Sequence, residues 1–253
     1  MNYLEKYDLK GRRALVTGAG RGIGRACAEA LALTGALVIC TDKNGAAAQN
    51  TANVIEEYGK TALSCELDVT NSKSIEKLAK SEEKFDIVVC NAGVVSWVDA
   101  HSMEDVTWND LMDVNLTGVF KTCRSFARKM IDQNGGVFVN IGSMSGNIIN
   151  DPQSQTHYNV SKAAVHHLTK SLAVEWAKYN IRVNAVAPTY IQTELLKQSK
   201  DIEKYIADWE RKTPMKRLGQ THEVASAVQF LSSDASSLIT GTILNVDGGY
   251  TCL

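Results

Sequence analysis

The sequence predicts an α/β fold: a doubly wound, seven-stranded parallel sheet in a single domain. Short β-type runs alternate with helical patterns along the 253 residues. Repeated βα units of this kind form a parallel sheet covered by helices on both faces. The three prolines, Pro152, Pro188 and Pro214, all fall in connections, and the chain has no internal repeat, low-complexity tract or linker. One domain over 1–253 follows, since single α/β domains often reach this length.

The elements follow one another in strict alternation, with a helical pattern between each strand and the next. The expected strands are Ala14–Thr17, Leu37–Thr41, Ala62–Glu66, Asp86–Cys90, Val137–Ile141, Ile181–Ala187 and Ile243–Val246. The expected helices are Gly22–Thr34, Ala46–Tyr58, Ser72–Ser81, Trp108–Ile131, Tyr158–Lys178 and His222–Leu231.

One connection, Thr189–Gln220, is too long for a simple link between a strand and a helix. Within it Ile202, Tyr205, Ile206 and Trp209 follow the i, i+3, i+4, i+7 spacing of an amphipathic helix. Long structured insertions often act as lids, so a small helical lid over a substrate pocket is expected at about 189–220.

The composition and net charge limit the kinds of molecule that the protein is expected to bind. The net charge is −1 and Lys and Arg are scattered, so neither nucleic acid nor an anionic membrane is an expected partner. No apolar segment resembles a signal peptide or a membrane span, and the six cysteines show no C-x-x-C spacing. A cytoplasmic protein with reduced thiols and a small-molecule partner is expected. The histidines lack the spacing of a zinc site, so no metal is expected.

The first strand ends in the glycine-rich segment Thr17–Gly24 and runs directly into a helix. At such a junction a dinucleotide pyrophosphate can bind backbone N–H groups and the positive helix end. The match is to the variant Thr-Gly-x-x-x-Gly-x-Gly, since Ile23 and Arg25 stand where G-x-G-x-x-G needs glycine. Asp42 ends the second strand, where a carboxylate can accept hydrogen bonds from the adenosine ribose. This favours NAD, although Arg21 and Lys43 could bind the extra phosphate of NADP, and Asp42 could instead serve as a turn or cap residue.

Tyr158 and Lys162 lie one helical turn apart at the start of a helical pattern. A fixed ammonium close to a phenol favours phenolate and lowers its pKa, which makes tyrosine a usable acid and base for carbonyl/alcohol interconversion. Alone, the pair is also what an ordinary amphipathic helix can carry. Its value depends on agreement with the other motifs.

Together these motifs resemble the short-chain dehydrogenase/reductase family, in its single-domain branch, over essentially the whole chain. The family's order and spacing are matched by Thr17–Gly24, Asp68-Val69, Asn91-Ala92-Gly93, Asn115, Ser143, Tyr158 and Lys162. The resemblance implies a Rossmann-like fold and an NAD(P)-dependent enzyme.

The resemblance also implies roles. Asn115, Ser143, Tyr158 and Lys162 would be catalytic: Ser143 binds the substrate oxygen, Tyr158 exchanges the proton, Lys162 holds the nicotinamide ribose and lowers the pKa of Tyr158, and Asn115 holds a water. Cofactor contacts would come from Gly18, Arg21, Gly22, Ile23, Gly24, Asp42, Asp68, Val69, Asn91, Ala92, Gly93, Tyr158, Lys162, Ile191 and Thr193.

Two departures leave questions open. The interval from Ser143 to Tyr158 is longer than in many relatives, so Ser145 competes for the serine role, although Ser143 is preferred because it lies two residues after Ile141, at the strand end. Pro188-Thr189 replaces a common Pro-Gly dipeptide, which puts in doubt the backbone path near the nicotinamide amide.

The segment from Ser143 to Gln153 is unusually polar and is expected to line the substrate pocket. Ser143, Ser145, Asn150 and Tyr158 are the expected substrate contacts, because buried hydroxyls of a polyol need hydrogen-bond partners. The alternative is a set of turn residues that face water. This segment and the C-terminal Val246–Tyr250 resemble the polyol dehydrogenases of the family, which act on galactitol, sorbitol, mannitol or arabinitol. They imply interconversion of a polyol and a ketose.

Two rival functions remain open. Arg124, Arg128 and Lys129 could dock an acidic carrier protein, which would suit an NADPH-dependent 3-oxoacyl reductase, although they could equally form a solvated helix face. A catalytically silent dinucleotide sensor is the other rival. The family resemblance implies a homotetramer.

Overall fold

The protein is built on one parallel sheet, as expected. The computed structural model describes residues 2–80, 84–193 and 200–253. Its sheet has seven strands in the order β3-β2-β1-β4-β5-β6-β9. They are β1 (Arg13–Thr17), β2 (Leu37–Asp42), β3 (Ala62–Glu66), β4 (Ile87–Cys90), β5 (Gly136–Ile141), β6 (Ile181–Pro188) and β9 (Ile243–Val246). The order reverses direction between β1 and β4, which creates the crevice where ligands bind in open α/β sheets.

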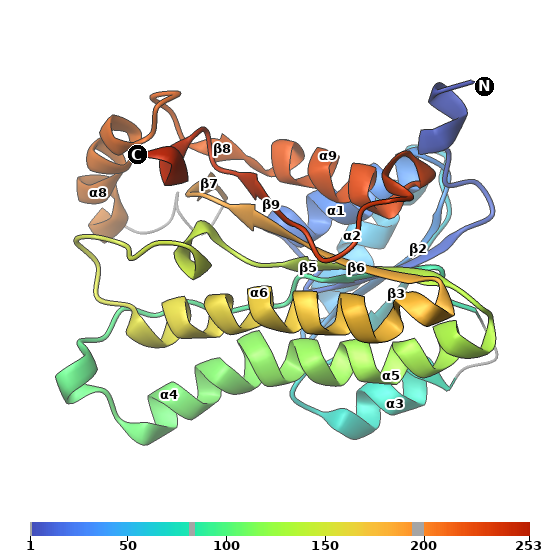
Figure 1. Cartoon of the computed structure of the whole chain (residues 1–253), viewed down its shortest axis with the longest axis horizontal. Helices are drawn as coiled ribbons and strands as arrows, with labels where there is room; N and C mark the ends of the chain where they lie inside the picture. Colours follow the sequence, from blue (N-terminus) through green and yellow to red (C-terminus); the bar gives the residue numbers. More distant parts are fainter. Residues whose placement is uncertain (1, 81–83, 194–199) are drawn as a thin grey trace.

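Helices cover both faces of the sheet (Figure 1). One face packs against α1 (Gly22–Leu33), α2 (Gly45–Glu57) and α9 (Thr221–Ser232), and the other against α3 (Ser72–Ala79), α5 (Gly118–Asp132) and α6 (Thr156–Trp176). Alternate strand residues serve the two cores: Val16 belongs to the first core and Leu15 to the second. Burial on both faces explains why the strands are almost continuously apolar.

The long helix expected at Trp108–Ile131 begins earlier and is not uniform. It consists of α4 (Asp105–Met112), a π-helical turn at Asp113–Thr117 and α5. Single π turns inside α-helices are frequent at functional sites, and Asn115 lies in this one. The helix expected at Ser72–Ser81 ends at Ala79, and Ser81 lies outside the described residues.

The long insertion contains the expected amphipathic helix, α8 (Lys200–Lys212), in which Trp209 is buried. The sequence did not predict that β7 (Ile191–Gln192) and β8 (Gly219–Gln220) form a second, two-stranded parallel sheet. Strands of two residues are too short to produce a periodic pattern. They bring the two ends of the insertion together, and Gln220 Nε2 donates to Gln192 Oε1 at 2.8 Å. Residues 194–199 of the insertion lie outside the described residues.

Short 3-10 turns complete the chain at Leu4–Tyr7, Ala100–Ser102, Met144–Gly146, Ala177–Tyr179, Asp234–Ser236 and Tyr250–Cys252. No helix among the described residues is both long and apolar enough to cross a bilayer.

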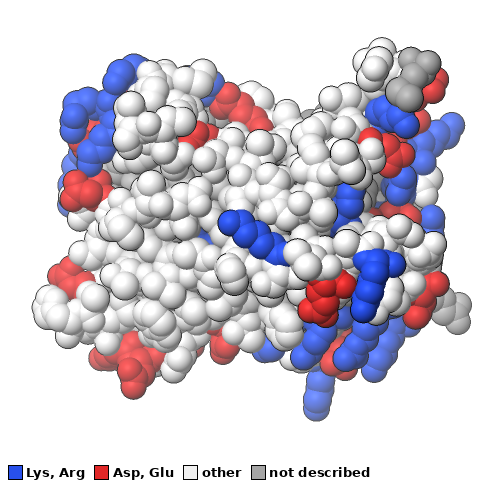
Figure 2. All heavy atoms as spheres, viewed as in Figure 1, with Lys and Arg blue, Asp and Glu red and all other residues white. Residues whose placement is uncertain are grey.

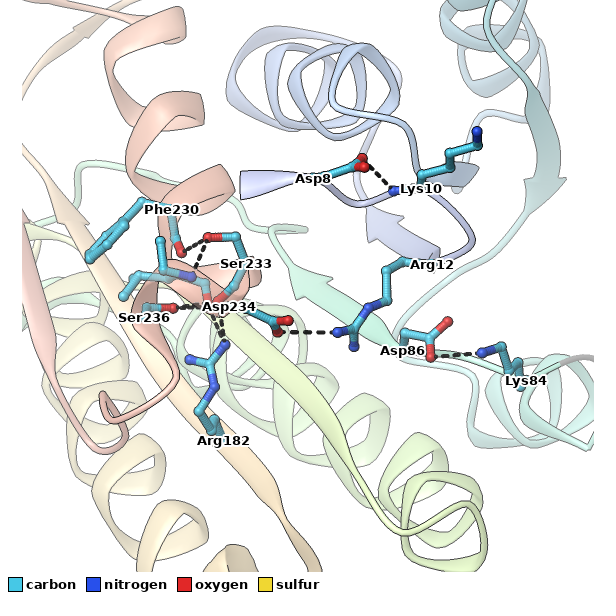
Figure 3. A network of polar contacts seen from close by, with 12 residues as sticks. Asp8, Lys10, Arg12, Lys84, Asp86, Arg182, Phe230, Ser233, Asp234 and Ser236 are labelled. Carbon is cyan, nitrogen blue, oxygen red and sulfur yellow. Dashed lines mark hydrogen bonds and ion pairs between the residues drawn. The ribbon is translucent and has the colours of Figure 1, made fainter. Parts of the chain in front are cut away.

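A polar network lies at the end of the sheet where the strands begin, opposite the crevice (Figure 3). The Arg182 guanidinium donates to the carbonyls of Leu231 at 3.0 Å and Ser233 at 3.1 Å. Arg12 pairs with Asp234 at 3.1 Å. A surface hollow of about 710 Å³ lies at this edge, lined in part by Arg12, and it does not include the residues expected to be catalytic.

Candidate active site

The glycine-rich loop after β1 leaves its backbone open to a ligand. Gly18 and Gly22 have positive φ angles of 62° and 57°, a region that only glycine adopts readily. A Cβ on Gly24 would collide with the carbonyl oxygen of Gly18 and with the Asn91 amide. Arg21, the N-cap of α1, makes no capping hydrogen bond with its side chain. The first amides of α1 are therefore not capped by a residue that would compete with a phosphate, and the loop fits a dinucleotide pyrophosphate.

Asp42 lies beside this loop, at the end of β2. Its carboxylate accepts the backbone N–H of Gly20 at 3.1 Å and that of Asn44 at 2.9 Å. These bonds fix the carboxylate next to the glycine loop, and the residue remains partly exposed. A fixed, partly exposed carboxylate at this place fits an adenosine ribose as its hydrogen-bond donor.

Asn91 joins the ends of β1 and β4. Its Nδ2 donates to the carbonyls of Thr17 at 2.9 Å and Gly18 at 3.0 Å. In return, the Thr17 hydroxyl accepts the backbone N–H groups of Asn91 and Ala92. Asn91 thus shapes the cofactor loop from within.

The remaining expected cofactor residues also lie at the carboxyl end of the sheet. Asp68 is exposed just after β3, where its carboxylate accepts bonds from Thr70. Val69 is buried. On the far side of the crevice Ile191 begins β7, and the Thr193 side chain would lie 3.5 Å from a Cβ on Gly22. The insertion therefore starts against the glycine loop.

Ser143, Tyr158 and Lys162 come together as the sequence predicts. Ser143 follows β5, and its side chain lies near enough to Tyr158 to lower the pKa of the phenol. Lys162, one turn along α6 from Tyr158, is buried with its Nζ 5.6 Å from the centre of the tyrosine ring. That Nζ donates to the carbonyl of Ile141 at 2.8 Å, and it would lie 3.7 Å from a Cβ on Gly93. Serine hydroxyl, phenol and ammonium thus converge behind the loop after β4.

The sequence predicts that Lys162 lowers the pKa of Tyr158. In the protein without cofactor this prediction is wrong. Burial raises the pKa of the phenol above its ordinary value, and the Ser143 side chain only opposes the rise. Burial also lowers the pKa of Lys162, to about 8. Both shifts have one cause, since removal from water disfavours phenolate and ammonium alike. At neutral pH Tyr158 is therefore a phenol, which suits it to donate a proton to a ketone.

Asn115 lies in the π turn and is fully buried. Its Nδ2 donates to the carbonyl of Val94 at 2.9 Å, and its Oδ1 accepts the N–H of Val94 at 2.8 Å. Nδ2 also lies 3.3 Å from the hydroxyl of Ser161. Asn115 therefore ties the loop after β4 to α6, while the water-holding role expected of it stays a prediction.

His166 supports the serine loop, a role that the sequence did not indicate. Its Nε2 accepts the backbone N–H of Ser143 at 3.4 Å, so Nδ1 carries the proton and donates to Asn147 Oδ1 at 3.1 Å. Burial, followed by the charges of Lys162 and Lys170, lowers the pKa of His166 to about 4. A neutral imidazole is needed here, because a protonated ring could not accept the amide.

The expected substrate residues Ser145 and Asn150 belong to a buried hydrogen-bond chain. Ser143 Oγ donates to Ser145 Oγ at 3.0 Å, and Gln155 Nε2 lies 3.5 Å from the same Ser145 oxygen. Gln155 Nε2 also lies 2.9 Å from Asn150 Oδ1, and Asn150 Nδ2 donates to the Tyr190 hydroxyl at 2.9 Å. Asn150 thus connects with Ser143 only through other side chains. Burial of this chain argues against water-facing turn residues.

Sequence reasoning missed Gln155 and Tyr190. Gln155 lies one helical turn before Asn159, and Gln155 Nε2 donates to Asn159 Oδ1 at 2.9 Å. That i, i+4 pair of amides was the available signal. Among the described residues no group of three or more His, Cys, Asp and Glu side chains is arranged to hold a metal ion.

Comparisons with known proteins agree with this geometry. A family model described as "Enoyl-(Acyl carrier protein) reductase" matches residues 18–251. Galactitol 2-dehydrogenase of Rhizobium johnstonii is 49% identical, with 100% of both chains covered. The crystal structure of gox2181 superposes with a TM-score of 0.97 at 46% identity, with 100% of both chains covered. A gluconate 5-dehydrogenase from Burkholderia cenocepacia, in complex with NADP and tartrate, gives 0.93 at 35% identity, again with 100% of both chains covered.

The fold and the site define an NAD(P)-dependent oxidoreductase that interconverts secondary alcohols and ketones. The chain belongs to the short-chain dehydrogenase/reductase family. The predicted fold, family and enzyme class are confirmed.

Proposed function

We propose that the protein interconverts a secondary alcohol of a polyol and the corresponding ketose, with NAD as the preferred cofactor and Tyr158 as the proton donor and acceptor. The observation that carries this is the convergence of three groups: the Tyr158 phenol, the Ser143 side chain that lowers its pKa, and the buried Lys162 ammonium near the phenol ring. A buried lysine next to a phenol and a serine, at the mouth of a dinucleotide crevice, is typical of a functional site.

In this mechanism Ser143 and Tyr158 act on the substrate oxygen, and Lys162 acts on Tyr158. Ser143 donates a hydrogen bond to that oxygen and holds it where negative charge grows. Tyr158 gives its proton to the oxygen in ketone reduction and takes the proton back in alcohol oxidation. The Lys162 ammonium stabilises the phenolate that reduction leaves behind. The nicotinamide, when bound, supplies the hydride chemistry.

A polyol fits the substrate side better than an acyl chain or a steroid. Ser143, Ser145, Asn150 and Tyr158 are the proposed contacts, and Ser143, Ser145 and Asn150 are each less than a tenth exposed. A substrate hydroxyl can donate to and accept from these side chains, whereas an acyl chain or a steroid ring offers them no hydrogen bond. The name of the galactitol 2-dehydrogenase relative supports the same substrate class.

The preference for NAD is proposed from Asp42. Its carboxylate is held by Gly20 and Asn44 beside the glycine loop, where a 2′-phosphate would bring two negative groups together. Arg21 and Lys43, both exposed, are the residues that could offset this repulsion. Since a relative binds NADP, the preference needs measurement.

We also propose a homotetramer and a cytoplasmic location. The C-terminal turn and the outer surface of α5 and α6 are the proposed contact surfaces. All six cysteines are free thiols, which suits a reducing compartment. Cell fractionation that recovers the protein from the periplasm or a membrane would contradict the location.

The experiment is a panel of hexitols, pentitols and matching ketoses, with NAD(H) and NADP(H), for the wild type and Tyr158→Phe. We expect polyol oxidation with a higher kcat/KM for NAD than for NADP. Tyr158→Phe keeps the ring but removes the proton, so kcat should fall by roughly 10²- to 10⁴-fold. A mutant as active as the wild type would refute the role of Tyr158.

The same panel addresses the two rivals. Preference for NADPH and a 3-oxoacyl thioester would point to the carrier-protein reductase and overturn the polyol proposal. Dinucleotide binding without turnover of any substrate would point to the silent sensor.

A further inference from the structure

Unpaired buried polar atoms gather at the substrate end of the molecule. Among the described residues six buried side-chain atoms have no hydrogen-bond partner. Four belong to the segment before the catalytic tyrosine or to the insertion and its root: Gln153 Oε1, His157 Nδ1, Thr189 Oγ1 and Trp209 Nε1. Native proteins leave few such atoms, so a local concentration of them needs an explanation.

Two of these atoms belong to side chains that border a single ring. Trp209, on α8, stacks on Tyr190 with ring centres 3.9 Å apart and planes at 6°. Gln153 Nε2 donates to the Tyr190 hydroxyl at 2.7 Å, which leaves Oε1 unpaired. Turning the amide over would only exchange which of its two polar atoms lacks a partner. Gln153 and Trp209 are 5% and 1% exposed, so solvent does not serve them.

The same ring is connected to the reacting groups by fixed hydrogen bonds. The chain of contacts from Ser143 through Ser145, Gln155 and Asn150 ends on the Tyr190 hydroxyl. Trp209 lies on the insertion, which starts against the glycine loop. Gln153 and Trp209 therefore contact a ring that is connected by hydrogen bonds to the serine proposed to hold the reacting oxygen.

The chemistry of the pair matches an alcohol. The indole N–H can only donate, while the glutamine carbonyl can only accept. A substrate hydroxyl can pair with either atom, whereas a methylene chain would leave both atoms unpaired. We propose that Gln153, Trp209 and Tyr190 form a specificity subsite for a substrate hydroxyl remote from the reacting carbon, which rests on the proposed polyol activity.

Packing alone is the competing explanation, since Trp209 also meets the Trp97 ring edge to face, with centres 6.5 Å apart. Phenylalanine could provide the same stacking on Tyr190 without an N–H. Trp209→Phe therefore separates the hydrogen bond from the packing. Gln153→Met is the second variant, because it keeps the length of the side chain and removes both polar atoms.

The test compares a hexitol with 1,2-propanediol, a diol that has no hydroxyl beyond the reacting carbon and its neighbour. Each variant should lose on the order of tenfold in kcat/KM for the hexitol, equivalent to about 1.4 kcal/mol. The value for propanediol should stay within about twofold, because only the remote hydroxyl loses its partner. Gln133→Met is the matched control: Gln133 Oε1 is also buried and unpaired, but the residue follows the far end of α5, so hexitol kinetics should not change.

Equal losses for both substrates in the two variants, or no loss for either, would overturn the subsite while leaving the polyol activity standing. A wild type that oxidises neither substrate would overturn the proposed function and the subsite with it. Thermal unfolding of each variant shows whether it is folded before the kinetics are compared.

Discussion

At the scale of single residues, the pKa of Tyr158, the proposed proton donor and acceptor, is governed by burial more than by the neighbouring Lys162. Helical spacing alone places Tyr158 and Lys162 together, but it gives no account of how much water surrounds them. In the structure burial raises the pKa of the phenol and lowers that of the ammonium. Lys162 therefore loses its proton at a lower pH than Tyr158, and the pH dependence of the reaction should reveal this order.

We expect opposite pH profiles for the two directions. Oxidation needs the Tyr158 phenolate, which is scarce below the raised pKa, so kcat/KM for oxidation should rise by roughly tenfold per pH unit through neutral pH. The rise should level off near the pKa of Lys162, about 8, because the ammonium that stabilises phenolate is then lost. Reduction uses the phenol and should be flat across neutral pH. Initial rates in both directions between pH 6 and 10 measure this.

Lys162→Arg provides the control for that profile, because guanidinium keeps its charge throughout this range. With the arginine the oxidation rate should continue to rise above pH 8. A variant profile that still levels off at the same pH would show that another group is responsible.

At the scale of elements, the insertion is held by its ends. After β8, helix α9 begins with a capping box, in which Glu223 accepts the N–H of Gln220 at 2.8 Å. Arg217, which precedes β8, donates to both oxygens of that carboxylate. These hydrogen bonds, those of Arg217 first, lower the pKa of Glu223 to about 2. One carboxylate thus fixes both the start of a core helix and the end of the insertion.

Glu223→Ala should lower the free energy of unfolding by about 1 kcal/mol at pH 7, since it removes a helix cap. The folded-state pKa lies below the ordinary value of 4.5, so the contribution is complete above pH 4.5 and is lost as pH falls toward 2. Urea unfolding of wild type and variant at pH 7 and pH 3 measures the difference. Glu57→Ala, at the exposed end of α2, is the control. A difference that is the same at both pH values would contradict the coupling.

At the scale of the whole molecule, one face is suited to self-association. Figure 2 shows that the left and middle of the face carrying α5 and α6 are largely uncharged, apart from a basic side chain near the centre, while charged side chains gather at the lower right. Val160 and Val174 are exposed on α6, at 41% and 83%, and Phe120 is exposed on α5 at 39%. Exposed apolar groups that share one face are typical of an interface.

Val174→Glu should therefore weaken the proposed tetramer, because a carboxylate in an apolar contact is costly. Light scattering after size-exclusion chromatography would show a lower mass, and the apparent mass should fall further on dilution. Leu33→Glu is the control, since Leu33 is 53% exposed at the end of α1, away from this face. An unchanged tetramer in Val174→Glu would place the interface elsewhere.

The sequence predicts the sheet and the proximity of Tyr158 and Lys162 because the signals for both are local. Val88-Val89-Cys90 is an apolar run buried on both sides, and Tyr158 and Lys162 need only one helical turn to meet. The contacts of Tyr190 with Asn150 and Gln153 join segments that are distant in sequence, so no local pattern indicates them. The predicted direction of the pKa shift of Tyr158 was wrong for the same reason, since burial of a side chain depends on the packing of several segments.

The small sheet formed by β7 and β8 has a consequence for how such enzymes diversify. Because the segment between these strands begins and ends at one paired point, its length and composition can change while the parallel sheet and the hydride-transfer groups keep their positions. Grafting the corresponding segment from a relative would therefore be a direct route to a new substrate preference on an unchanged catalytic frame.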